Sequence, residues 1–408
     1  MTQLSHFVQL LEQQVFFAAA VLLIMGFIFS RLAKVVKLPR VTGYIIAGIL
    51  LGPSIMKVFT HTALTQMEFM PQFALGIIAM VIGAGLSFSL IKRLGIGLLL
   101  ITLCESLGAF FLVMLLLSWL KMPLEAVLPL AAIAAATAPA ATVAVIREYR
   151  AAGPFTETIM AVVALDDAVA ITLFGLIMTL DIKNLSGFGE AAIHSISRSV
   201  LEILFAFLIG LALAILAHLL IKLTKEMSDA LIVIMGVVLL GVTLATVAGV
   251  SHLLTNMFLG MILINISGKN SEIVSGLERA APPIYVFFFV LAGAHLDLDV
   301  FIKSGSTLVI WGLAFVAARL VGKVGGAFFG GTISKSPAMI RKYLGFALAP
   351  QAGVAIGLSL LISKASGYYD FRSIILNITL MAVAVNEIVG PVLTKIALFK
   401  SGEASNVE

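Results

Sequence analysis

Six charged residues lie inside long apolar runs of the sequence, where a charge is costly. They are four acids and two bases: Glu105, Asp166, Asp167, Arg319, Lys323 and Glu387. An ionised side chain at the centre of a bilayer costs roughly 2.5–3.5 kcal/mol on insertion scales, so six in one chain point to a function. The default interpretation of such residues is therefore ion or proton chemistry within a membrane, which is weighed below for each residue.

Asp166 and Asp167 stand next to each other in the run ALDDAV. Successive helical residues are about 100° apart around the axis, so one carboxylate can face a cavity while the other turns to a neighbouring helix. Adjacent carboxylates in a poorly solvated site repel each other, and we expect at least one to exchange a proton near physiological pH. Carboxylate oxygens also suit hard cations. The pair predicts a proton carrier that also binds a hard metal cation through its oxygens.

The other four intramembrane charges are candidate partners of this pair. Lys323 lies between glycines in RLVGKVGG, and we expect it to pair with one aspartate and to release it when a cation binds; an interfacial lysine is the alternative. Arg319, one helical turn earlier, is expected to hold a fixed ion pair with Glu105 or Glu387. A structural role is favoured for Glu105, whereas Glu387 is either a third titrating group or the partner of Arg319.

The composition of the chain indicates a membrane protein. Of its 408 residues, 61% are hydrophobic and 12% are charged, whereas soluble domains carry about 25% charged residues. These values exclude a soluble enzyme, a nucleic-acid-binding protein and a disordered chain, and the long apolar runs exclude an outer-membrane barrel. The single cysteine excludes an internal disulfide, and we assign no role to the six histidines.

Thirteen apolar segments are long enough to be interpreted as membrane spans. They cover about residues 14–34, 41–57, 72–90, 95–118, 125–146, 155–179, 197–221, 228–249, 251–266, 281–296, 303–332, 340–363 and 373–398. The N-terminus lacks the features of a signal peptide, so the first span is expected to be retained. No linker or tail is long enough for a soluble domain, so residues 1–408 are predicted to form one all-α polytopic membrane unit.

Lysine and arginine are unevenly distributed among the loops. Seventeen of the 26 lie in the odd-numbered loops and at the C-terminal end, and seven lie in the even-numbered loops. Basic residues mark the cytoplasmic side of a membrane protein. The N-terminus is therefore predicted outside and the C-terminus in the cytoplasm.

The sequence repeats its pattern after seven spans. The matching stretches are IGAGLSFSLIKRLG (82–95) with LAGAHLDLDVFIKSG (291–305), ATAPAATVAVI (136–146) with ALAPQAGVAIG (347–357), and ALDDAV (164–169) with AVNEIV (384–389). Six spans repeated at an offset of seven have opposite orientations. We predict an inverted repeat with repeat one at 14–179, a linker helix at 197–221 and repeat two at 228–398, an organisation typical of secondary transporters.

Pro139 and Pro350 occupy matching positions in the two repeats. A proline inside a helix removes a hydrogen bond and either breaks the helix or, as the alternative here, kinks it. Both prolines stand among small residues, and Gln351 and Gly353 follow the second. We predict two broken helices that cross at their unwound segments and offer carbonyls and helix ends to an ion.

Four motifs carry a family resemblance. LPRVTGYIIAGILLGP (38–53), TAPAATVAVI (137–146), ALDDAVAI (164–171) and RLVGKVGG (319–326) resemble the bacterial cation:proton antiporters, particularly the sodium/proton exchangers with an aspartate pair. The resemblance implies a homodimer of thirteen-helix protomers in the bacterial inner membrane, each with a dimerisation domain and a core domain of crossed broken helices. It also implies that Asp167 binds the cation, that Asp166 pairs with Lys323, and that Thr137 belongs to the site.

The same resemblance implies a secondary transporter rather than an enzyme. It implies electrogenic exchange of two protons per Na⁺ by an elevator movement, with no cofactor and with cations, protons and the lipid bilayer as partners. Potassium/proton exchange of the Kef type is the alternative, although Kef members carry Pro-Arg-Gly-Glu where this chain reads APQAG (349–353). Ala138 replaces a polar residue of many members, so the ion stays open among Na⁺, K⁺ and Li⁺.

Two functions of other classes would also place charged residues within a membrane. An intramembrane aspartyl protease uses two carboxylates, but they must meet from separate helices, and the chain contains no Gly-x-Gly-Asp motif. A passive cation channel would conduct without coupling one gradient to another, so an assay against a gradient separates it from a transporter.

Overall fold

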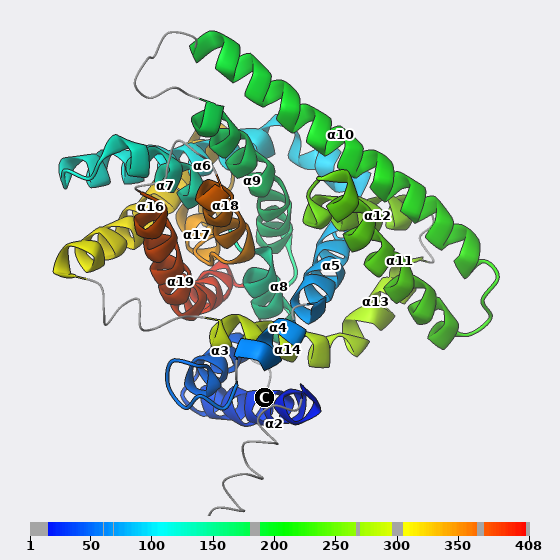
Figure 1. The fold of residues 1–408 in the computed structure, drawn as a ribbon. Helices are drawn as coiled ribbons and strands as arrows, with labels where there is room; N and C mark the ends of the chain where they lie inside the picture. The colour runs from blue at the N-terminus through cyan, green and yellow to red at the C-terminus, as the bar shows by residue number, and fades with distance from the viewer. Residues whose placement is uncertain are drawn as a thin grey trace, which may run out of the picture. The chain divides into compact units, whose positions relative to one another are not determined.

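The structure, a computed structural model, describes residues 15–59, 61–67, 69–179, 188–266, 270–295, 305–364 and 371–404. Helices joined by short turns make up this part of the chain, which contains no strand (Figure 1). The N-terminal 14 residues and the loops that carry Lys183, Lys269 and Lys303 lie outside the described residues. The predicted all-α architecture is therefore confirmed.

Many of the described helices have the length and polarity of membrane spans. Eight are long and apolar enough to cross a membrane, or nine if the bent pair Glu272–Ala280 and Pro282–Ala294 counts as one span, within the described part of the chain. Three shorter apolar helices, Arg40–Leu51, Phe69–Ala84 and His252–Ile266, coincide with predicted spans. The polytopic membrane fold is confirmed, and the number of thirteen crossings stays a prediction.

The helices group into two compact units, each built from two stretches of chain. The first unit contains residues 1–85 and 206–299, and the second contains residues 86–205 and 300–408. Helix α10 (Phe188–Ile221) continues from the second unit into the first. Each unit thus combines helices from both halves of the sequence, whereas the predicted repeat divides the chain in order, and that repeat stays a prediction.

Two helix pairs of the first unit cross in close contact at glycines. Its helices are α2 (Val15–Val35), α3 (Arg40–Leu51), α4 (His61–Gln66), α5 (Phe69–Ala84), α11 (Met227–Ala248), α12 (His252–Ile266), α13 (Asn270–Ala280) and α14 (Pro282–Ala294). A Cβ atom on Gly83 of α5 would lie 1.8 Å from the Met257 carbonyl oxygen of α12, and one on Gly48 of α3 would lie 2.0 Å from the Val290 carbonyl oxygen of α14. In the predicted inverted repeat, α3 corresponds to α12 and α5 corresponds to α14, so the α3–α14 crossing is the counterpart of the α5–α12 crossing.

The second unit contains both breaks that the prolines predicted. Its helices are α6 (Phe88–Trp119), α7 (Leu124–Ala135), α8 (Pro139–Glu148), α9 (Pro154–Thr179), α16 (Ser306–Ile333), α17 (Ala338–Ala347), α18 (Gly353–Lys364) and α19 (Arg372–Ser401). The non-helical residues 136–138 separate α7 from α8, and the non-helical residues 348–352 separate α17 from α18. Pro139 begins α8, where its missing N–H leaves no helical hydrogen bond unmade. The predicted pair of broken helices is confirmed.

Two further contacts fix the helices of the second unit around these breaks. Helix α16 packs directly on α6 because a Cβ on Gly326 would lie 2.2 Å from the Cys104 carbonyl oxygen and one on Gly322 would lie 2.5 Å from the Gly108 carbonyl oxygen. The Glu403 carboxylate accepts hydrogen bonds from the backbone N–H groups of Phe155 and Thr156 in the first turn of α9, and both N···O distances are 2.7 Å. This negative charge at a helix N-terminus favours α9 starting there.

We predict that Gly326→Ala destabilises the protein and that its neighbour Gly325→Ala does not. The added methyl at position 326 meets the α6 backbone, and overpacking of this kind costs about 1–3 kcal/mol, whereas nothing lies within 4 Å of a Cβ at Gly325. Alanine at position 325 should even gain helix propensity. Thermal unfolding in detergent measures both variants. Equal melting temperatures would contradict the backbone contact between α6 and α16.

Candidate functional site

The two breaks meet each other inside the second unit. The Ala138 N–H donates to the Pro350 carbonyl oxygen at 2.9 Å, which joins the two unwound segments directly. Helix α19 approaches the second break just as closely, since a Cβ on Gly390 would lie 2.7 Å from the Pro350 Cα. The small residues around both prolines make this approach feasible. The predicted crossing is therefore present.

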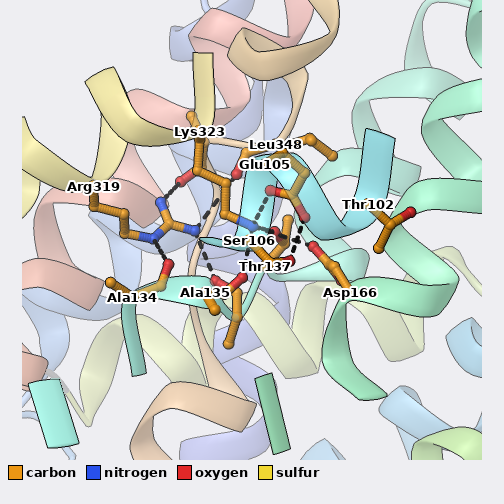
Figure 2. A network of polar contacts seen from close by, with 12 residues as sticks. Thr102, Glu105, Ser106, Ala134, Ala135, Thr137, Asp166, Arg319, Lys323 and Leu348 are labelled. Carbon is orange, nitrogen blue, oxygen red and sulfur yellow. Dashed lines mark hydrogen bonds and ion pairs between the residues drawn. The ribbon is translucent and has the colours of Figure 1, made fainter. Parts of the chain in front are cut away.

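Arg319 binds the carbonyl ends of both broken helices. Its guanidinium donates to five backbone carbonyl oxygens, those of Ala134 at 3.1 Å, Ala136 at 2.8 Å, Leu348 at 3.5 Å, Ala349 at 2.6 Å and Pro350 at 3.2 Å. Figure 2 labels Ala134 and Leu348 among these residues. The expectation of a fixed ion pair with Glu105 or Glu387 is wrong. Carbonyl groups freed by the breaks would otherwise be buried without a donor, and the planar guanidinium supplies several donors at once.

Lys323 lies on α16, one turn after Arg319, and contacts both carboxylate and backbone oxygens. Its Nζ lies 2.6 Å from Glu105 Oε2 and 3.4 Å from Asp166 Oδ2. The same Nζ donates to the Ala135 carbonyl oxygen at 2.6 Å and to Thr137 Oγ1 at 2.7 Å. Figure 2 shows Glu105, Thr137 and Asp166 gathered around this ammonium. The lysine is completely buried, so the interfacial alternative is wrong.

Asp166 and Asp167 lie in the middle of α9 and are both buried, with 0% and 6% of their surfaces exposed. In the described structure Oδ1 of each aspartate has no hydrogen-bond partner. A buried carboxylate oxygen without a donor is costly unless it takes up a proton or a cation. Both side chains therefore keep a free acceptor oxygen, and Asp166 also contacts Lys323.

The second break carries its own polar contacts, and Glu387 stands apart from them. Gln351 Nε2 donates to the Ile133 carbonyl oxygen at 3.0 Å, and Asn386 Nδ2 donates to Gln351 Oε1 at 3.0 Å. Gly353 begins α18. Glu387, next to Asn386 on α19, is buried, and its two carboxylate oxygens have no hydrogen-bond partner within the described structure. Its predicted role as a third titrating group stays a prediction.

Sequence reasoning missed the pairing of Glu105 with Lys323. Glu105 lies on α6, three residues before the Gly108 contact with α16, and the Ser106 hydroxyl donates to its Oε1 at 2.7 Å. The spacing of Gly322, Gly326 and Gly330 at every fourth residue was a usable signal, because it marks one helix face that accepts a close neighbour. No signal could identify the backbone carbonyls that Arg319 binds.

The chain matches a known family in sequence and known structures in fold. A family model described as "Sodium/hydrogen exchanger, transmembrane" matches residues 18–400. The structure is similar to that of the sodium proton antiporter MjNhaP1 from Methanocaldococcus jannaschii at pH 8, with a TM-score of 0.70, 18% identity, and coverage of 95% of this chain and 98% of that chain. An electron-microscopy structure of MjNhaP1 gives a TM-score of 0.68 at 20% identity, covering 95% and 94% of the two chains. No curated protein matches the chain.

We predict that Arg319→Gln strongly destabilises the protein, because the substitution leaves several buried carbonyl oxygens without a donor. Each unsatisfied buried polar group costs about 1–3 kcal/mol. The matched control is Arg93→Gln, since Arg93 forms an ion pair with Glu157 that is largely exposed and should contribute little. Thermal unfolding in detergent compares the two variants. A shift for Arg319→Gln no larger than that for Arg93→Gln would show that the carbonyl ends do not need this side chain.

Proposed function

The chain belongs to the sodium/hydrogen exchanger family, and from this we propose that it is an electrogenic Na⁺/H⁺ antiporter whose transported ions bind at Asp166 and Asp167. The single observation that carries the proposal is the presence of two adjacent buried carboxylates, each with an unpartnered oxygen, of which Asp166 contacts the buried ammonium of Lys323. Such a site is costly when empty and becomes favourable with either protons or a cation in it. Competition for one site couples the two fluxes.

Asp167 is the proposed cation ligand, and Asp166 is the aspartate that contacts Lys323. When both carboxyl groups are ionised, they can only accept hydrogen bonds and their negative charges repel each other. Either two protons or one Na⁺ can reduce this repulsion. Thr137 contributes a hydroxyl in the first break, where it already accepts a hydrogen bond from Lys323. Exchanging two protons for one Na⁺ moves one net positive charge across the membrane, which makes the proposed cycle electrogenic.

The movement that exposes the site to each side is proposed to be an elevator motion of the second unit. Its support is that the aspartates, Lys323 and both breaks all belong to that unit, with its helices joined by the α6–α16 contact and by the Glu403 cap. We further propose a homodimer in a bacterial cytoplasmic membrane with the N-terminus outside. The uneven distribution of basic residues among the loops supports this orientation.

Potassium/proton exchange is the second candidate, and the first break provides the observation that favours considering it. Residue 138 is alanine, so only the Thr137 side chain contributes a hydroxyl there. Carboxylate and carbonyl oxygens bind Na⁺, K⁺ and Li⁺ alike, and selectivity then depends on the size of the site. A series of the three ions in the same transport assay separates the candidates.

We predict that Asp167→Asn abolishes exchange because the amide can neither carry a proton nor offer a charged ligand. Proteoliposomes loaded with a pH-sensitive dye measure proton movement after a Na⁺ pulse. The matched control is Glu226→Gln, which removes an exposed carboxylate just before α11 and should leave transport unchanged. Sodium-driven proton movement that survives in a folded Asp167→Asn protein would refute the proposed site.

We also predict that a Na⁺ pulse displaces net charge in the wild type and not in Asp167→Asn, as measured on a supported membrane. The stoichiometry follows from the gradients at which net flux stops at zero membrane potential. For two protons per Na⁺, the balancing pH difference is half the sodium gradient in logarithmic units, whereas for one proton per Na⁺ the two are equal. Equality would show that the exchange is electroneutral.

A further inference from the structure

The proposed cation site contains a third carboxylate that the aspartate pair does not require. Glu105 lies on α6, completely buried, with its Oε2 2.6 Å from Lys323 Nζ. Asp166 Oδ2 lies farther from the same nitrogen, at 3.4 Å. The carboxylate in shortest contact with Lys323 therefore comes from a helix other than the one that carries the aspartates.

Lys323 has close partners other than Asp166. Its Nζ forms an ion pair with Glu105 Oε2 at 2.6 Å and donates hydrogen bonds to the Ala135 carbonyl oxygen at 2.6 Å and to Thr137 Oγ1 at 2.7 Å. An ammonium has three N–H groups, and the third hydrogen bond, to Asp166 Oδ2, is long at 3.4 Å. The ammonium therefore keeps an ion pair and two short hydrogen bonds when Asp166 turns to another ligand.

The Glu105–Lys323 pair is also fixed in place by the packing of its two helices. A Cβ on Gly326 would lie 2.7 Å from the Glu105 Cα, so α6 and α16 are in backbone contact at this level. The Ser106 hydroxyl holds the other carboxylate oxygen, Oε1, at 2.7 Å. Asp166 stands on α9, outside this backbone contact, and its Oδ1 has no partner in the described structure. The geometry therefore separates a fixed carboxylate from an available one.

We propose that Glu105 is a positioning residue that supplies the permanent counter-charge of Lys323 and so leaves Asp166 available to the transported cation. The inference rests on the proposed function and adds a determinant of cation affinity to it. Without Glu105, Asp166 becomes the carboxylate nearest to the ammonium, and their attraction competes with cation binding. The lysine then acts as a tethered competitor of Na⁺.

The test compares Glu105→Gln with the wild type in proteoliposomes. The Na⁺ KM should rise at least about tenfold, while the rate at saturating Na⁺ changes much less, because the loss is one of ground-state cation binding. Glu105→Asp keeps the charge and should recover most of the affinity. A purely structural role of Glu105 would lower the rate in proportion to the folded fraction and leave KM unchanged, and that result would overturn the inference.

A double-variant cycle tests whether Glu105 acts through Lys323. Apparent Na⁺ affinity is read from the rise in melting temperature with Na⁺ concentration, which does not require turnover. In the Lys323→Met background, adding Glu105→Gln should leave the affinity unchanged, because no ammonium is left to compete. The same loss of affinity in both backgrounds would mean that Glu105 acts directly on the cation and would overturn the inference.

The design remains decisive if Glu105→Gln alone does not fold. In the double variant with Lys323→Met both members of the Glu105–Lys323 pair are neutral, and the remaining buried aspartates can take up protons, so this variant is expected to fold; it is compared with Lys323→Met. If the wild type neither binds Na⁺ nor exchanges it for protons, the proposed function fails and this inference fails with it. If the wild type responds to Na⁺ and Glu105→Gln has the same affinity, the inference alone is wrong.

Discussion

Backbone carbonyls freed inside an apolar interior are the constraint on which the second unit depends. A helix leaves its last four carbonyl groups without partners, and within a membrane water cannot replace them. The end of α7 meets this need with side chains from distant parts of the chain. Gln351 binds the carbonyl of Ile133, Arg319 binds those of Ala134 and Ala136, and Lys323 binds that of Ala135.

The same constraint explains why the two broken helices must be near each other. The Arg319 guanidinium reaches the carbonyls of residues 348–350 as well as those of the first break, so one side chain satisfies both ends. Thr142 adds a bond from α8 to the Ala347 carbonyl oxygen at 3.1 Å. Because each break supplies donors or acceptors to the other, neither would be stable alone. The partial negative charges of two helix C-termini also offset the positive charge of the arginine.

The features that depend on local chemistry could be predicted from the sequence. Contacts that depend on how closely two helices approach each other could not. Apolar runs gave the helices, and Pro139 and Pro350 among small residues gave the breaks, because proline acts on its own helix. The partners of Arg319 were predicted wrongly, since charge pairing suggested an acid and the competing carbonyls belong to residues without a distinctive side chain. The Glu105–Lys323 contact required the separation of α6 and α16, which only the spacing of glycines on α16 hinted at.

The two bases on successive turns of α16, Arg319 and Lys323, have different partners because their charged groups differ in shape. A guanidinium has five donors in a fixed plane and suits a rigid set of carbonyl acceptors, whereas an ammonium is a compact charge whose donors rotate. Arg319 accordingly contacts backbone atoms that cannot change partners without unfolding the breaks. Lys323 contacts a fixed acid, Glu105, and a second acid, Asp166, on another helix. A site that binds protons and cations in turn needs one base with fixed partners and one with an exchangeable partner. If Arg319 changed partners with each bound ion, the contact between the two breaks would be lost.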